Sequence, residues 1–457
     1  MGNPLRSTLA GLPSRLLQNP LLRRVLRNSG YLLSANTLQA VLSFVQSVLA
    51  ARLLGVEALG LLGAITQFAS VINRFTSFRM GELVVSYVGQ FSARRQDEHA
   101  AAVFKAAALA EMASSLLAYA ILLGLAPLGA RFFAQDPSLV GLFRLYGLSV
   151  LANLIAESSA GLLHILNRFR SIAFLTVGQS VLTLLLIVAA YVRADGLPAV
   201  LLAYLLGKVA YAFGISAVAM VQAGRHWGRD WWKAPFMLLA DRRGELVRFS
   251  LSTNVTTTLT LVTRDSEMLW LSALSNPLQA GYYKLALAIM NIVIMPIDPL
   301  IRTTYREVAR EIGGRRWENV RYLLRSGSVL SALWTIPVVL GLILLGPWVI
   351  STFWGESFLP SYPSVVVLLL GVVAVNIFYW NRNVLLPLGK PGFPTGVYLV
   401  AAVLRVAGML AVVPVMGALG MALLLSAFYL GTVAVLVMKT VREIQLAAAQ
   451  APHAAGV

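Results

Sequence analysis

Residues 52–60 read RLLGVEALG, and residues 273–281 read ALSNPLQAG. Each stretch separates two long apolar runs and ends on a glycine, and these glycines, Gly60 and Gly281, are 221 positions apart. Three further pairs of segments share an offset of 221 or 222: RRQDE (94–98) with RRWEN (315–319), LNRFR (166–170) with LGKPG (388–392), and Gly196 with Gly417. A nearly constant offset across four separate loops indicates that the chain contains an internal duplication.

The apolar runs are long enough to cross a membrane. Hydrophobic residues make up 58% of the 457 residues and charged residues only 12%, whereas soluble chains carry about 25% charged residues. A membrane-spanning helix needs about 20 apolar residues, and we count twelve such runs, centred on 30–52, 59–85, 104–128, 140–165, 171–192, 197–221, 249–272, 281–304, 326–350, 363–386, 394–414 and 418–438. The sequence therefore predicts an all-α polytopic membrane protein with twelve transmembrane helices.

Lysine and arginine are unevenly divided between the loops on the two sides of these spans. The loops on the side of the two termini carry 24 of them, and the loops on the other side carry two, Arg131 and Arg193. Because basic residues are enriched on the cytoplasmic side of membrane proteins, both termini are expected in the cytoplasm.

The longest basic loop divides the spans into two sets of six. The predicted organisation is a cytoplasmic interfacial segment (1–29), an N-terminal six-helix lobe (30–222), a cytoplasmic linker (223–248), a C-terminal six-helix lobe (249–438) and a cytoplasmic tail (439–457). An even number of spans per repeat makes the two lobes parallel, related by an axis along the membrane normal, and a central cavity between them is expected.

Composition argues against several other classes of function. The net charge of +18 comes from basic residues that flank or interrupt apolar spans, so we do not expect nucleic acid as a partner. The chain has no cysteine, its four histidines lack metal-ligand spacing, and it has no GxxxxGK[ST] phosphate-binding loop. We predict no catalytic residues, no metal and no cofactor, and the short outer loops disfavour a membrane-embedded polymerase or glycosyltransferase.

One predicted span carries three ionisable residues in the stretch LTLVTRDSEMLWL (259–271). Arg264 and Glu267 are three positions apart and share a helix face, whereas Asp265 points about 100° away. Charges inside a bilayer are costly and mark functional sites or buried ion pairs. The equivalent positions in the first repeat are not charged, which favours a function. A buried ion pair that fixes helix packing is the alternative.

Permanent positive charges are frequent in the deeper parts of the spans. Arginine matches phosphate oxygens geometrically and stays charged, so a cavity lined this way favours an anionic ligand such as a diphosphate head group. The candidate residues for this site are Arg74, Arg79, Lys208, Arg264, Arg302, Arg382 and Arg405.

Acidic residues inside the spans are candidates for ion coupling or gating. Asp298 lies in MPIDPL (295–300) between two prolines, which kink helices and free backbone carbonyls. It would serve as a proton or cation site there, or else pair with Arg302 one turn further on. The complete set of acidic candidates is Asp265, Glu267, Asp298, Glu82, Glu111 and Glu157.

The chain resembles the oligosaccharide and polysaccharide flippases of the multidrug/oligosaccharidyl-lipid/polysaccharide exporter superfamily over residues 30–440. Three segments carry the resemblance: SANTLQAVLSFVQSVLAARLLGVEALGLLGAITQF (34–68), FRMGELVVSYVGQFSARRQDEHAAAVF (78–104) and NVLLPLGKPGFPT (383–395). The repeat offset also fits the paired six-helix lobes of that family.

The resemblance implies a V-shaped transporter of the bacterial plasma membrane. It implies that a polyprenyl-diphosphate-linked oligosaccharide is flipped by alternating access, its head group in a cationic cavity and its lipid tail in the bilayer. It further implies proton or sodium coupling in some members, and a polysaccharide polymerase or glycosyltransferase as a neighbour. Two transporter classes remain as alternatives: a small-molecule exporter of the same superfamily, whose pocket for organic cations should be acidic, and a major facilitator transporter.

Overall fold

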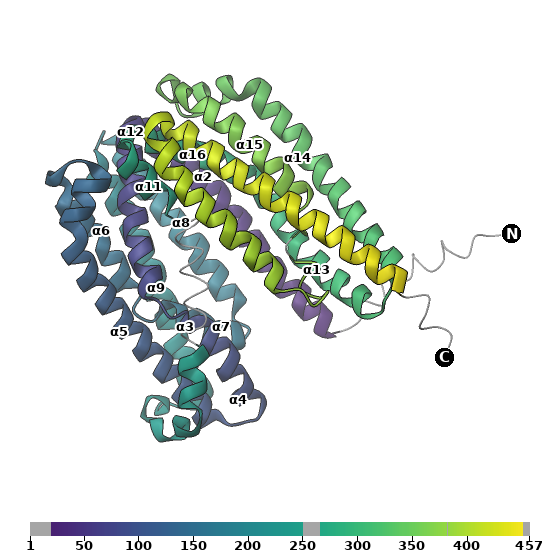
Figure 1. Ribbon diagram of the computed structural model, residues 1–457. Coiled ribbons are helices and arrows are strands. Elements are labelled where there is room, and N and C mark those ends of the chain that lie inside the picture. The colour runs from purple at the N-terminus through teal and green to yellow at the C-terminus, as the bar shows by residue number, and fades with distance from the viewer. Residues whose placement is uncertain (1–19, 250–265, 382, 451–457) are drawn as a thin grey trace. The chain divides into compact units, whose positions relative to one another are not determined.

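The computed structural model describes residues 20–249, 266–381 and 383–450 (Figure 1). All regular structure within these ranges is helical. In the first half of the chain the helices are α2 (Pro20–Thr76), α3 (Met80–Leu83), α4 (Gly89–Ala93), α5 (Asp97–Gly129), α6 (Val140–Ala152), α7 (Ala156–Ile165), α8 (Phe169–Val192) and α9 (Leu197–Trp227). In the second half they are α11 (Glu267–Leu274), α12 (Pro277–Ile294), α13 (Asp298–Gly313), α14 (Trp317–Phe353), α15 (Tyr362–Ile377) and α16 (Gly392–Gln450).

Nine helical segments within the described residues are long and apolar enough to cross a membrane. Two of them contain a break where a loop is predicted: the backbone leaves helical geometry at Gly55 (φ 74°) in α2 and at Gly417 (φ 53°) in α16. Only glycine adopts such angles without strain, so each break separates two predicted spans. The seventh predicted span, 249–272, lies mostly outside the described residues, and the count of twelve stays a prediction.

The interruption predicted at MPIDPL is present. α12 ends at Ile294, a short 3₁₀ turn covers Met295–Ile297, and α13 begins at Asp298 with a proline in its first turn. Proline has no amide hydrogen and fits the first turn of a helix, where no intrahelical bond is lost. The eighth span therefore ends near residue 297, earlier than the predicted 304.

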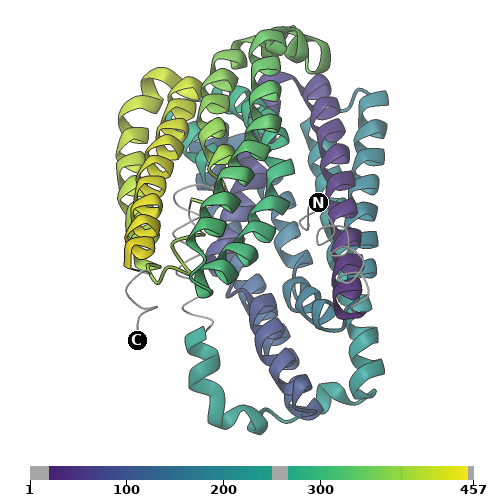
Figure 2. The same ribbon diagram turned by 90° about the vertical axis from the view of Figure 1, so that its right-hand side faces the viewer.

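The chain divides into two compact units. Unit 1 contains Ala69–Ala126 and the described parts of Met1–Leu49 and Val140–Leu261, and unit 2 contains Ala50–Phe68, Pro127–Leu139 and the described part of Val262–Val457. In unit 1, side chains such as Val84, Phe104 and Leu162 are fully buried between α5, α7 and α9. In unit 2, α14, α15 and the two arms of α16 lie side by side (Figures 1 and 2).

The apolar surface of these helices is large, as a lipid environment requires. Leu333 and Leu344 on α14 are 70% and 77% exposed, and Val415 on α16 is 84% exposed. Backbone amides and carbonyls are satisfied within each helix, so apolar side chains are free to face hydrocarbon. The described chain is therefore a multi-pass membrane protein.

Gly60 and Gly281, the glycines used to recognise the duplication, lie inside unit 2, and each packs against the backbone of the segment that contains the other. A Cβ atom on Gly60 would lie 1.9 Å from the carbonyl oxygen of Pro277, and a Cβ on Gly281 would lie 2.0 Å from that of Val56. Both pairs of equivalent residues, Gly60 with Gly281 and Val56 with Pro277, are offset by 221. Such reciprocity is what a local two-fold axis produces, because equivalent residues then make equivalent contacts.

Substitution of Gly60 by alanine is expected to destabilise the protein by roughly 1–3 kcal/mol, as overpacking does. The reason is that backbone, which cannot rotate away, occupies the space of the new methyl group. The measurement is the thermal midpoint of the purified protein in detergent. Gly178→Ala is the matched control, because a Cβ on this α8 glycine meets nothing within 4 Å. Equal midpoints for the two variants would contradict the close approach.

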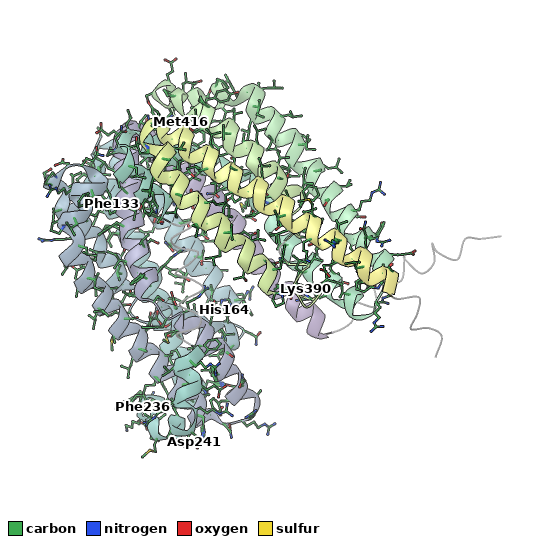
Figure 3. The ribbon with its side chains drawn as sticks, in the orientation of Figure 1. Phe133, His164, Phe236, Asp241, Lys390 and Met416 are labelled. Carbon is green, nitrogen blue, oxygen red and sulfur yellow. The ribbon has the colours of Figure 1, made fainter. Side chains whose placement is uncertain are left out.

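The predicted linker 223–248 packs on unit 1. After α9 it forms two short helical turns, Trp231–Lys233 and Phe236–Arg242. The Lys105 ammonium of α5 lies 4.0 Å from the ring centroid of Phe236, a cation–π contact. Phe236 and Asp241 lie together at this end of unit 1 (Figure 3).

Candidate functional site

The second predicted span is interrupted. α2 ends at Thr76, α3 begins at Met80, and Arg79 between them has a left-handed backbone conformation with φ 51°. The Thr76 hydroxyl donates to the Ile72 carbonyl at 3.0 Å, and the Arg79 amide donates to the Ser77 hydroxyl at 3.3 Å. Local side-chain bonds of this kind compete with the helical ladder, which accounts for the break without a proline.

The fourth predicted span is interrupted beside it. α6 ends at Ala152 and α7 begins at Ala156. A Cβ on Gly161 of α7 would lie 2.6 Å from the carbonyl oxygen of Gly81 in α3, and a Cβ on Gly81 would lie 2.8 Å from the carbonyl oxygen of Glu157. The backbones of α3 and α7 are therefore in contact, and the two interruptions adjoin.

Glu111 of α5 caps the start of α7. Its carboxylate accepts hydrogen bonds from the Glu157 amide at 2.7 Å, the Ser158 amide at 2.8 Å and the Ser158 hydroxyl at 2.6 Å. The first amides of a helix lack partners within it and carry a partial positive charge, and Glu111 supplies both an acceptor and a negative charge. The Glu111 side chain is buried, with the residue 5% exposed. Both of its oxygens are occupied by α7.

Glu157 lines a polar cavity of about 190 Å³ next to the cap. Its carboxylate oxygens each lie 3.4 Å from the Ser77 hydroxyl, and the residue is exposed. Asn73 and Ser115 also line the cavity; Ser115 is 4% exposed and has no hydrogen-bond partner among the described residues. Carboxylate, amide and hydroxyl oxygens are the donors that hard cations prefer, so the cavity has the chemistry of a cation or proton site.

Positive charge adjoins this cavity. Arg79 forms an ion pair with Glu82, with 2.6 Å between Nη2 and Oε1, and the two side chains are 44% and 49% exposed. Arg74, in the last turn of α2, is exposed as well. Both arginines are close enough to Glu157 to interact with its carboxylate electrostatically. The structure therefore brings together five of the predicted site residues in unit 1: Arg74, Arg79, Glu82, Glu111 and Glu157.

In unit 2 two further candidates form a buried ion pair. Arg405 Nη2 of α16 lies 2.5 Å from Glu267 Oε1 of α11, and the side chains are 2% and 6% exposed. The Tyr283 hydroxyl donates to Glu267 Oε2 at 2.5 Å, and the guanidinium lies 5.5 Å from the ring centroid of Phe428. One predicted head-group residue and one predicted coupling residue thus neutralise each other.

The remaining candidates do not join either group. Lys208 of α9 lies with its ammonium 5.1 Å from the ring centroid of Tyr146. Asp298 and Arg302 lie on α13, but their side chains are outside the described part of the structure. Arg264, Asp265 and Arg382 are also outside the described residues.

A larger cavity, of about 830 Å³, lies between the two arms of α16. Lys390 and Met416 mark the ends of the first arm (Figure 3). The cavity is lined by Val400, Leu404 and Phe428, and Arg405 also contributes to its wall. The lining of this cavity is almost wholly apolar and the Arg405 guanidinium is held by Glu267, so the cavity offers few polar groups to a ligand.

Ser77 and Tyr283 are among the residues of these sites that were not predicted. Ser77 contacts the Glu157 carboxylate and Tyr283 contacts that of Glu267. Serine and tyrosine are common in membrane helices, so neither residue type alone signals a site. The signal available was the neighbourhood of Ser77, which follows Thr76 and lies two positions before Arg79.

Comparisons with known proteins show the family and the fold of the chain. A family model described as polysaccharide biosynthesis protein matches residues 25–305. A search of curated proteins gave no significant match. Several solved structures match nearly the whole chain at low sequence identity.

One similar structure is an inward-facing multidrug resistance MATE transporter of the MOP superfamily: TM-score 0.70, 16% identity, covering 90% of this chain and 95% of that one. Another is the lipid II flippase MurJ: TM-score 0.69, 16% identity, 91% and 90% covered. A third is a MOP superfamily transporter from Pyrococcus furiosus: TM-score 0.64, 14% identity, 95% and 98% covered. At these identities the likeness shows the fold.

Proposed function

The chain belongs to the family of polysaccharide biosynthesis proteins, and from this membership we propose that it is a flippase. Its substrate is a polyprenyl-diphosphate-linked oligosaccharide, moved from the cytoplasmic to the outer leaflet of a bacterial plasma membrane by alternating access for cell-surface polysaccharide assembly. A protein of the same fold is a lipid II flippase, which supports a lipid-linked substrate. A polysaccharide polymerase or glycosyltransferase would act as its neighbour.

The observation that carries the proposal is the meeting of two interrupted spans in unit 1. Broken transmembrane helices are where transporters bind substrates and coupling ions. Here the breaks bring an exposed arginine pair, Arg74 and Arg79, beside the Glu157 cavity. The arginines are suited to a diphosphate, and Glu157 is suited to a proton or sodium ion. Glu111, with both oxygens occupied, serves as the residue that positions Glu157.

The proposed architecture keeps twelve spans in two parallel six-helix lobes, with both termini in the cytoplasm. The breaks at Gly55 and Gly417 support two spans in each of the longest helices. The reciprocal contact of Gly60 and Gly281 supports a two-fold relation between the repeats. Mechanistically, binding at the Glu157 cavity would favour one of the two states of an alternating-access cycle.

The alternative function is a cation-coupled small-molecule exporter of the same superfamily. The similarity of the fold to that of a multidrug transporter supports this alternative. Such a pocket should hold organic cations with carboxylates. In unit 1 the exposed Glu82 is paired with Arg79, and Glu157 lines the polar cavity. The flippase proposal is favoured because the family model described as polysaccharide biosynthesis protein matches residues 25–305, and because two exposed arginines, which suit a phosphate, lie beside the cavity.

The test is transfer of a fluorescent polyprenyl-diphosphate oligosaccharide between leaflets of liposomes that contain the full-length protein. Arg79→Ala is expected to lower the transfer rate by roughly 10- to 150-fold, since a charge-assisted hydrogen bond contributes about 1.5–3 kcal/mol. Arg79→Lys should restore part of the rate because it keeps the charge. Arg193→Ala, an exposed arginine outside the site, is the matched control and should transfer at the wild-type rate.

Glu157→Gln separates coupling from substrate binding. If Glu157 carries the coupling ion, this variant should lose the stimulation of transfer by a proton or sodium gradient while keeping the basal rate. Wild-type protein that leaves the lipid-linked substrate in place but exports organic cations would overturn the flippase proposal in favour of the alternative.

A further inference from the structure

A basic pocket lies at the junction of α13 and α14 in unit 2. It has a volume of about 440 Å³ and is lined by Arg315, Arg316, Trp317, Glu318, Asn319 and Arg321, with Ala448 of α16 at its edge. Three arginines thus face one glutamate. Arg315 and Arg321 have no ion-pair partner among the described residues.

Part of this pocket is held in place by Glu311 of α13. Its carboxylate accepts from Arg316 Nε at 2.7 Å and from Asn319 Nδ2 at 2.8 Å. The hydrogen bond from Asn319 and the neighbouring arginines keep the pKa of Glu311 below its usual range, so the carboxylate stays ionised at neutral pH. Glu311 is buried and positions two pocket residues while leaving Arg315 and Arg321 available.

An apolar crevice of about 530 Å³ adjoins the pocket. Leu324, Phe378, Trp380 and Ile444 line it, and Arg321 and Arg325 stand at its rim. Arg321 lines both cavities, so the basic pocket and the apolar crevice are neighbours. The Trp380 indole already donates to the Ser328 hydroxyl at 2.8 Å, and the crevice therefore presents hydrocarbon.

We propose that this pocket and crevice bind an anionic phospholipid of the cytoplasmic leaflet, with its phosphate among Arg315, Arg321 and Arg325 and one acyl chain in the crevice. Basic pockets between helices on the cytoplasmic side recognise such head groups. Snorkelling of arginine to the membrane surface explains one basic side chain at a helix end. It does not explain three of them, Arg315, Arg321 and Arg325, which have no ion-pair partner among the described residues and line a basic pocket and the apolar crevice next to it. The inference is independent of the transported substrate.

The test is native mass spectrometry of the full-length protein, titrated in detergent with phosphatidylglycerol or phosphatidylcholine. The triple variant Arg315→Gln/Arg321→Gln/Arg325→Gln should lose at least about ten-fold in apparent affinity for phosphatidylglycerol, because each basic residue near an anionic lipid head group contributes to binding. The control is Arg94→Gln/Arg95→Gln/Arg229→Gln, which removes the same charge from exposed loops of unit 1.

A second variant probes the crevice without changing charge. Ala332 lines it, and Ala332→Trp should fill part of its volume and weaken phosphatidylglycerol binding with the arginines intact. Equal losses in the two arginine triples would overturn the proposal, because binding would then follow net charge. Retention of a polyprenyl diphosphate but not of phosphatidylglycerol at the site would also overturn it, in favour of the transported substrate.

Discussion

Replacement of Arg405 by leucine is expected to destabilise the protein by about 3–5 kcal/mol, the usual cost of leaving one member of a buried ion pair without its partner. The Glu267 carboxylate would remain at the centre of unit 2 with the Tyr283 hydroxyl as its one remaining hydrogen-bond donor among the described residues. Glu267→Leu should cost a similar amount, because it leaves the buried guanidinium unpaired. The measurement is the thermal midpoint in detergent, together with the yield of monodisperse protein.

The double variant Glu267→Leu/Arg405→Leu distinguishes a structural pair from a functional one. Two apolar side chains of similar volume often replace a buried pair without loss, so the double variant should recover most of the stability that each single variant loses. Residues in contact couple energetically, and the cycle measures that coupling. Arg193→Leu serves as the arginine-to-leucine control at an exposed position.

Transport by the double variant decides what the pair does. The burial of both side chains indicates a role in packing. The folded double variant should then still transfer the lipid-linked substrate. A folded double variant without transfer would return Arg405 to the head-group site. Stability that fails to recover would instead show that the hydrogen bond from Tyr283 and the contact with Phe428 require the charges.

This pair also shows how far sequence reasoning reaches. The stretch LTLVTRDSEMLWL identified Glu267 as an intramembrane charge with a function or an ion-pair role. The sequence also singled out Arg405, as a head-group residue, but it did not predict the pairing with Glu267, because the two residues are 138 positions apart and on different helices. Long-range pairing of this kind depends on how α11 and α16 pack, and no spacing rule within one helix encodes it.

The breaks in the helices are likewise of two kinds, those that the sequence marks and those that it does not. Two prolines at MPIDPL and glycines at 55 and 417 mark three of them in the sequence, since these residues have definite backbone preferences. The breaks at Arg79 and at 153–155 contain neither residue type. They follow from Ser and Thr hydroxyls and from a carboxylate on α5, whose contacts become apparent only in the packed structure.

The duplication was the most accessible feature. An offset of 221 predicted that Gly60 and Gly281 are equivalent, and unit 2 places each against the backbone of the other's segment. Close helix approach needs small residues, so glycine at both positions has a physical reason. The charged residues, in contrast, differ between the repeats, and only the structure shows which of them lie together.

Glu111→Leu is expected to destabilise the protein by about 2–6 kcal/mol, because it leaves two backbone amides at the start of α7 without an acceptor, at about 1–3 kcal/mol for each unsatisfied buried group. The amides are those of Glu157 and Ser158. Ser158→Ala is the milder comparison, since it removes only the hydroxyl bond and should cost about 1 kcal/mol. Thermal midpoints in detergent report both effects.

Glu111→Gln tests whether the cap or the charge matters for transport. Glutamine has the same shape and keeps one carbonyl oxygen for the α7 amides, so the variant should retain part of the stability that leucine loses. If Glu111 only positions Glu157, Glu111→Gln should keep gradient-stimulated transfer while Glu157→Gln loses it. Loss of gradient stimulation in a stable Glu111→Gln protein would instead make Glu111 the ion-coupling group. The coupling ion would then bind the buried carboxylate of Glu111 on α5 and not the carboxylate of Glu157 on α7.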